Sequence, residues 1–164
     1  EVVADYNKQF GRKYSPFVDE YIMDDTNIAF FIQGGHPRTA RFAVNHLRKQ
    51  GVKAGVSRLR FMRPFPTKAV AASLSKVKAV GCVETSTSYG GASRGGNLIH
   101  EARTACYNLD KRPVITSFMA GLGGEIVTLN EFYAMAKVLS DAVKSGKANN
   151  SYWMNFEKEV LDAH

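Results

Sequence analysis

Continuous hydrophobic runs alternate along the chain with segments that are hydrophobic on one side only. Residues 27–33 (NIAFFIQ) are apolar almost throughout, as expected of a strand that is covered on both faces of a sheet. Residues 38–50 instead repeat apolar side chains at helical spacing. Gly34 and Gly35 separate the two segments, and Gly51 follows the second. The pattern therefore predicts a strand, a tight turn and a helix that ends at a glycine.

The same unit occurs again further along the chain. The pattern predicts further strands at 53–60, 78–84 and 113–119, and further helices at 1–10, 66–75, 97–109 and 128–144. Thr128 followed by Glu131 is the pattern of a capping box at the start of the last helix. Repeated strand–helix units predict an α/β fold, with a mostly parallel sheet between two layers of helices.

We expect three parts along the chain. Residues 1–25 form a lead-in helix and connector, residues 26–147 an α/β domain, and residues 148–164 a tail. The tail carries four large apolar residues, Tyr152, Trp153, Met154 and Phe156. Such a cluster is expected to dock, either on its own domain or on a partner subunit.

The formal charge of +7 is unevenly distributed. Residues 26–83 contain no Asp or Glu but eleven Lys and Arg, whereas the rest of the chain has eleven basic and fifteen acidic residues. This asymmetry indicates a surface for phosphate ligands or for an acidic partner, or else a solvated basic face. Nucleic acid is not expected, because the stretch has no binding motif and its aromatic residues Phe30, Phe31 and Phe42 fall at core-like positions.

Two cysteines without metal-ligand spacing indicate a reduced, cytoplasmic setting, and no apolar run is long enough for a membrane span. The histidines are far apart, so no metal site is predicted. Cys82 and Cys106 fall inside predicted elements and are expected in the core. We predict no catalytic residue within this chain.

Four loops follow the carboxyl ends of predicted strands, where ligands of parallel sheets bind. They are residues 34–38, 61–66, 84–96 and 120–124. The possible ligand residues lie in the first and third of them: Gly34, Gly35, Glu84, Thr85, Ser86, Gly90 and Gly91. Backbone N–H groups at the first loop could bind an anion, and a turn without a ligand is the alternative. Glu84 is the best-placed carboxylate, with a solvated or capping role as its alternative.

The last loop contains the sequence GLGG at 121–124. Gly121, Gly123 and Gly124 allow another backbone to approach closely. Glu125 comes next and disfavours phosphate there. We therefore predict packing against a second chain at this loop.

Several motifs in order carry a resemblance to a known family. They are Gly11, Arg12 and Tyr14 in a GR-x-Y segment, then LRKQGVKAGVSRLRFMRPFP, then ETSTSYGG, and finally GLGG followed by Thr128. Residues 1–145 in this way resemble the transketolase C-terminal-like domain of the α subunit of 2-oxoacid:acceptor oxidoreductases, of which the pyruvate:ferredoxin enzyme is the best-known type.

The resemblance implies a role in oxidative decarboxylation of a 2-oxoacid on thiamine diphosphate and Mg²⁺. Electrons would pass through Fe–S clusters to ferredoxin or an NAD-linked acceptor, and the acyl group usually to coenzyme A. The implied partners are an upstream pyrimidine-binding domain, a β subunit that binds the thiamine pyrophosphate, and γ/δ-type and Fe–S subunits. This chain alone would bind none of these cofactors.

The resemblance also gives RFMRPFP, residues 60–66, an expected role in docking. Pro64 and Pro66 stiffen the loop, Phe65 can fill an apolar pocket, and Arg60 and Arg63 can contact carboxylates of an adjoining domain. The alternative is a stiff turn whose arginines pair within the chain. For the whole chain, the alternatives are an independent nucleotide- or coenzyme-binding module and the C-terminal domain of a transketolase-like enzyme.

Overall fold

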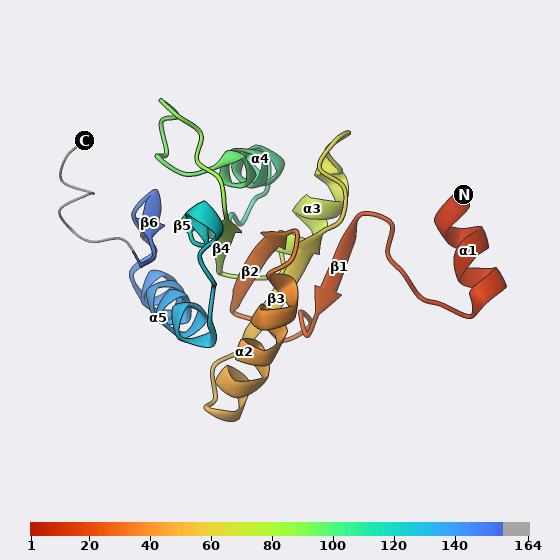
Figure 1. Cartoon of the computed structure of the whole chain (residues 1–164), viewed down its shortest axis with the longest axis horizontal. Helices are drawn as coiled ribbons and strands as arrows, with labels where there is room; N and C mark the ends of the chain where they lie inside the picture. Colours follow the sequence, from red (N-terminus) through yellow and green to blue (C-terminus); the bar gives the residue numbers. More distant parts are fainter. Residues whose placement is uncertain (156–164) are drawn as a thin grey trace.

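The computed structural model describes residues 1–155 and contains one six-stranded sheet between two layers of helices (Figure 1). The strand order is β1-β3-β2-β4-β5-β6. The strands are β1 (Val18–Tyr21), β2 (Ile28–Gln33), β3 (Ala54–Leu59), β4 (Ala79–Glu84), β5 (Val114–Met119) and β6 (Ser151–Trp153). The helices are α1 (Val2–Phe10), α2 (Pro37–Lys49), α3 (Thr67–Leu74), α4 (Asn97–Cys106), the short 3₁₀ turn η1 (Leu122–Gly124) and α5 (Leu129–Ser145).

The predicted α/β class is confirmed. Strands β2, β3, β4 and β5 occupy the predicted positions, and all neighbouring pairs are parallel except β1 with β3. The carboxyl ends of the four predicted strands therefore meet at one edge of the sheet, as the strand–helix alternation requires.

Each face of the sheet is covered by two helices. Helices α2 and α5 pack on one face, where Phe30 of β2 meets Phe132 of α5 edge to face at 5.2 Å. Helices α3 and α4 pack on the other face around Phe31, Val80 and Ile99. Strands covered on both sides bury the side chains of both faces, which explains the largely apolar runs in the sequence.

Two short edge strands were not predicted. Strand β1 lies within residues 11–25, for which we expected only a connector, and it pairs antiparallel with β3. Strand β6 lies in the predicted tail and pairs with Ser117–Met119, while Tyr152 stacks on Phe118 with ring centroids 5.6 Å apart. The described part of the tail thus packs on its own domain. Phe156 lies outside the described residues.

Helix α1 stands apart from the sheet (Figure 1) and has no buried residue. Its aromatic side chains gather beside the connector: the ring of Tyr6 lies 4.7 Å from Phe10 and 6.1 Å from Tyr14. Asn7 exchanges two hydrogen bonds with the backbone of Tyr14, at 2.8 and 2.9 Å. The helix is therefore tied to the connector, and its aromatic face is exposed.

One core prediction was wrong. Phe30 and Phe31 are fully buried, but Phe42 is 62% exposed. The buried stripe of α2 consists of Pro37, Ala40, Ala43, Val44 and Leu47. Phe42 lies out of phase with that stripe, so it points to solvent.

Candidate functional site at the carboxyl edge of the sheet

A hollow of about 370 Å³ lies at the carboxyl edge of the sheet. Its walls come from the ends of β2 and β4, the loop before α3 and the first turn of α4. The lining residues are Gln33, Gly34, Met62, Val83, Glu84, Thr85, Ser86, Asn97 and Leu98. The structure therefore brings four of the seven predicted ligand-loop residues together: Gly34, Glu84, Thr85 and Ser86.

The Glu84 carboxylate is buried, and it joins three elements. It accepts hydrogen bonds from the backbone N–H of Leu98 at 2.5 Å, from that of Gly96 at 3.1 Å and from the Ser117 hydroxyl at 3.0 Å. The first two donors belong to the start of α4, where a negative charge is favourable. Both oxygens are engaged in holding β4, β5 and α4 together, which is the capping role that we gave as the alternative for this residue.

Burial raises the pKa of Glu84 above its ordinary value of 4.5, although the bonds from Leu98, Ser117 and Gly96 act in the opposite direction. The carboxylate faces hydrogen-bond donors of its own domain. Its geometry suits organisation of the loop better than proton transfer to a bound substrate.

The loop between β4 and α4 folds back on itself. The Ser88 N–H donates to the carbonyl of Gly95 at 2.9 Å, and Ser93 Oγ lies 3.1 Å from His100 Nε2. Gly90 and Gly91 belong to the outer part of this loop and do not line the hollow. Tyr89, which precedes Gly90 in the same loop, is 96% exposed.

Gly34 and Gly35 form an exposed turn before α2, and Gly34 has a positive φ of 84°. Pro37 occupies the first position of the helix, where it removes one backbone donor. His36 precedes it, and its pKa is lowered by burial. Anion binding by this turn stays a prediction.

Both arginines of RFMRPFP have contacts within the chain. The guanidinium of Arg60 lies over the Tyr14 ring at 5.2 Å, and Arg63 forms an ion pair with Glu101 of α4 at 2.7 Å. Phe65 is half-buried against the core on the α3–α4 side of the sheet, and Pro64 and Pro66 flank it. Phe61, which we had not singled out, is 52% exposed.

The glycines of GLGG adopt backbone angles that favour glycine. Gly121, Gly123 and Gly124 have φ values of 76°, 69° and 86°. A Cβ on Gly123 or Gly124 would meet nothing within 4 Å, so that side of the loop is open. Close by in sequence, Ile126 is 78% exposed.

Three loops at this edge thus each expose one large side chain: Phe61, Tyr89 and Ile126. Sequence reasoning missed all three, because the strand and helix patterns concern buried positions. The available signal was the presence of a large apolar or aromatic residue inside a predicted loop.

The basic stretch at residues 26–83 is partly neutralised. Its cations form four ion pairs with acids on either side of it: Arg41 with Asp19, Arg48 with Asp25, Arg63 with Glu101 and Lys76 with Glu20. Four of the eleven positive charges of the stretch are therefore paired locally in the fold.

Neither cysteine is suited to nucleophilic chemistry. Burial raises the pKa of the Cys82 thiol well above its ordinary value, and it raises that of Cys106 to about 11. Residues 1–155 hold no group of three His, Cys, Asp or Glu that could bind a metal ion. No helix in the same range is both long and apolar enough to cross a membrane.

Comparison with known proteins finds relatives that cover the sheet and its carboxyl-edge loops. The family model described as pyruvate:ferredoxin oxidoreductase core domain II matches residues 26–132. The ketoisovalerate oxidoreductase subunit VorA of Pyrococcus abyssi (strain GE5 / Orsay) is 31% identical over 159 residues, which is 96% of this chain and 40% of that protein. The pyruvate synthase subunit PorA of Pyrococcus horikoshii (strain ATCC 700860 / DSM 12428 / JCM 9974 / NBRC 100139 / OT-3) is 32% identical over 162 residues, 98% of this chain and 40% of that protein.

A solved 2-oxoglutarate:ferredoxin oxidoreductase from Magnetococcus marinus has the same fold over 83% of this chain and 23% of its own. The TM-score is 0.53 and the sequence identity 14%. Of the two Pyrococcus relatives, in contrast, the chain spans about 40% of the length.

Proposed function

Because this chain belongs to the pyruvate:ferredoxin oxidoreductase core domain II family, we propose that it is an assembly domain of a thiamine-diphosphate-dependent 2-oxoacid:acceptor oxidoreductase. The complete enzyme would decarboxylate a 2-oxoacid oxidatively. It would pass electrons through Fe–S clusters to ferredoxin or an NAD-linked acceptor, and usually transfer the acyl group to coenzyme A. The family match favours this type of thiamine enzyme over a transketolase-like one.

The observation that carries the proposal is the set of exposed side chains at the carboxyl edge, Phe61, Tyr89 and Ile126. Exposed apolar side chains on several loops at one edge of a sheet are candidates for contact with a partner. A partner placed here would cover RFMRPFP and GLGG together. Arg60 and Arg63 lie in the same loop as Phe61 and would contribute polar contacts at its rim.

A second face supports a multi-part assembly. Helix α1 has nine residues and buries none of them. An isolated helix this short is marginal in water, so its aromatic face gains stability only when something covers it. An adjoining domain of the same enzyme would do so.

The cofactors would lie elsewhere in the assembly. Both oxygens of Glu84 are engaged by backbone and Ser117 donors, so this carboxylate does not fit a role as a ligand of Mg²⁺. We place thiamine diphosphate with an upstream pyrimidine-binding domain and a pyrophosphate-binding β subunit, and the Fe–S clusters in γ/δ-type or separate subunits. Such an enzyme would work in the cytoplasm.

The test introduces Phe61→Ser with Ile126→Ser in the source assembly and measures subunit composition by native mass spectrometry. Phe42→Ser is the matched control, because Phe42 is similarly exposed but lies on α2. We expect the double variant to fold normally, with an unchanged thermal midpoint, and to lose partner subunits and 2-oxoacid turnover. Intact assembly and full turnover in the double variant would overturn the proposal.

A further inference from the structure

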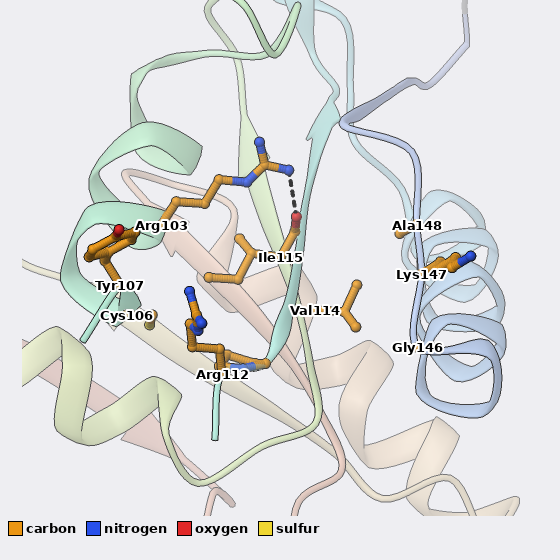
Figure 2. A pocket seen from close by; sticks show the side chains of 10 residues that line it. Arg103, Cys106, Tyr107, Arg112, Val114, Ile115, Gly146, Lys147 and Ala148 are labelled. Atoms are coloured by element: carbon orange, nitrogen blue, oxygen red, sulfur yellow. Dashed lines mark hydrogen bonds between the residues drawn. The ribbon is translucent and has the colours of Figure 1, made fainter. Parts of the chain in front are cut away.

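A second hollow, of about 570 Å³, lies where β5 begins, at the opposite end of the sheet from Glu84. Figure 2 shows the residues that line it. Three segments surround it: the last turn of α4, residues 112–115 at the start of β5, and residues 146–148 after α5. None of the residues that we predicted as site residues lies there.

Three cations from these segments line the hollow, and no carboxylate does. They are Arg103, Arg112 and Lys147. Among residues 1–155 none of the three forms an ion pair, whereas four cations of the basic stretch do. Asp110 precedes Arg112 by two residues and makes no ion pair with it. An uncompensated group of cations attracts an anion.

The arginines are held in defined places. Arg103 reaches from α4 to β5, and its Nη2 donates to the carbonyl of Ile115 at 2.9 Å (Figure 2) and to Asn150 Oδ1 at 2.9 Å. Arg112 lies over the ring of Tyr107, 5.7 Å from its centroid. Because two bonds occupy one nitrogen of Arg103, the other donors of its guanidinium remain for a ligand.

The edge of β5 is also open at this point. Strand β6 begins its pairing at Ser117, two residues after Ile115. Ile115 turns its carbonyl away from β4, toward Arg103, and the N–H of the same residue points to that side too. A backbone donor thus lies beside the guanidinium of Arg103.

The ends of α4 and α5 oppose the binding of an anion here. Both helices bring their C-terminal ends to the hollow, and such ends carry partial negative charge. Arg103, in the last turn of α4, offsets much of that charge. Arg112 and the unoccupied donors of Arg103 then remain as the principal anion ligands, above a floor formed by Cys106, Pro113, Val114 and Ala148, whereas the side chain of Lys147 points away from both arginines (Figure 2).

We propose that this hollow binds a small organic phosphate. Arginine donates two parallel hydrogen bonds to phosphate oxygens, and two arginines reach this hollow from different segments. The apolar floor and the exposed ring of Tyr107 offer a surface for the organic part of the ligand. The inference is independent of the proposed assembly function, because it concerns the other end of the sheet and is tested on this chain alone.

The experiment titrates the chain with inorganic pyrophosphate at fixed ionic strength and follows binding by calorimetry and amide NMR shifts. We expect shifts at Tyr107 and Ile115, and an affinity about tenfold lower in Arg112→Gln, as for the loss of one charge-assisted contact. The matched controls, Arg38→Gln and Lys49→Gln, each remove one positive charge from an exposed position on α2 and should leave the affinity unchanged.

Equal losses in the α2 variants would mean that the chain attracts anions only through its net charge, and would overturn the proposal. A polyglutamate peptide that binds where pyrophosphate does not would also overturn it, in favour of an acidic protein partner. Loss of subunit assembly in the Phe61→Ser, Ile126→Ser variant with unchanged pyrophosphate binding would separate this site from the proposed function.

Discussion

The hydroxyl of Ser117 donates a hydrogen bond to the carboxylate of Glu84 at 3.0 Å, which ties β5 to β4 near the carboxyl edge of the sheet. The same carboxylate receives the N–H groups of Gly96 and Leu98, so one side chain fixes the start of α4 and the end of the exposed loop before it. The loop between β4 and α4 is in this way supported by a buried polar network at its base.

Glu84→Ala should destabilise the chain by about 3 kcal/mol, because it leaves several buried donors without an acceptor. The free energy of unfolding in urea measures the effect. Glu125→Ala is the control, since Glu125 is exposed beside GLGG. Equal losses in the two variants would show that the network contributes little.

The pKa of Glu84 predicts how stability depends on pH. Since burial raises it above 4.5 in the folded chain, the folded state holds the proton more tightly than the unfolded state does. The stability contributed by this group is therefore present below pH 4.5 and is lost as pH rises through the raised value.

Glu84→Gln, which never ionises, should lack this loss. The stability of the unsubstituted chain minus that of the variant should fall as pH rises from 4 to 7, as measured by urea unfolding at each pH. A difference that grows with pH would mean that the hydrogen bonds from Leu98, Ser117 and Gly96 outweigh burial.

Gly96→Ala should destabilise the loop. A Cβ at this position would lie 2.3 Å from the carbonyl oxygen of Ser86 and 2.4 Å from Glu84 Oε1. Such a clash displaces the carboxylate and costs about 2 kcal/mol. Gly35→Ala is the matched control, because its added Cβ would meet nothing within 4 Å and its φ is not positive. Thermal unfolding of both variants tests the prediction, and equal midpoints would contradict it.

The central sheet could be predicted from the sequence because its strands are covered on both faces. Apolar runs of strand length, such as residues 27–33 and 78–84, are typical of strands that are buried on both faces. Strands β1 and β6 could not be, because they are edge strands of four and three residues. Their pairing depends on neighbours that are distant in sequence, not on a local pattern.

The candidate site was predictable to the same extent. Parallel topology brings Gly34 and Glu84 to one edge, so their meeting followed from the strand order. The exposure of Phe61, Tyr89 and Ile126 did not follow, because a loop residue can turn inward like Phe65 or outward like Phe61. The prediction that Phe42 lies in the core was wrong for a related reason. Its burial depends on which stripe of α2 faces the sheet.

The strength of the ion pair between Arg63 and Glu101 tests whether RFMRPFP is a docking loop or a stiff turn whose arginines pair within the chain. The two side chains are 2.7 Å apart, and that of Arg63 is 63% exposed. Solvent screens such a pair, so Arg63→Ala and Glu101→Ala should each change the free energy of unfolding by less than about 1 kcal/mol. A double-mutant cycle on the chain, with urea unfolding as its measurement, gives the coupling directly.

Assembly should distinguish the two variants. If Arg63 contacts a partner at the rim of the docking surface, Arg63→Ala weakens subunit association, whereas Glu101→Ala leaves it intact, because it frees the guanidinium for the partner. Native mass spectrometry over a salt series measures both. Equal association in the two variants, with a coupling near 1 kcal/mol in the isolated chain, would assign Arg63 to the internal turn alone and leave docking to Phe61 and Ile126.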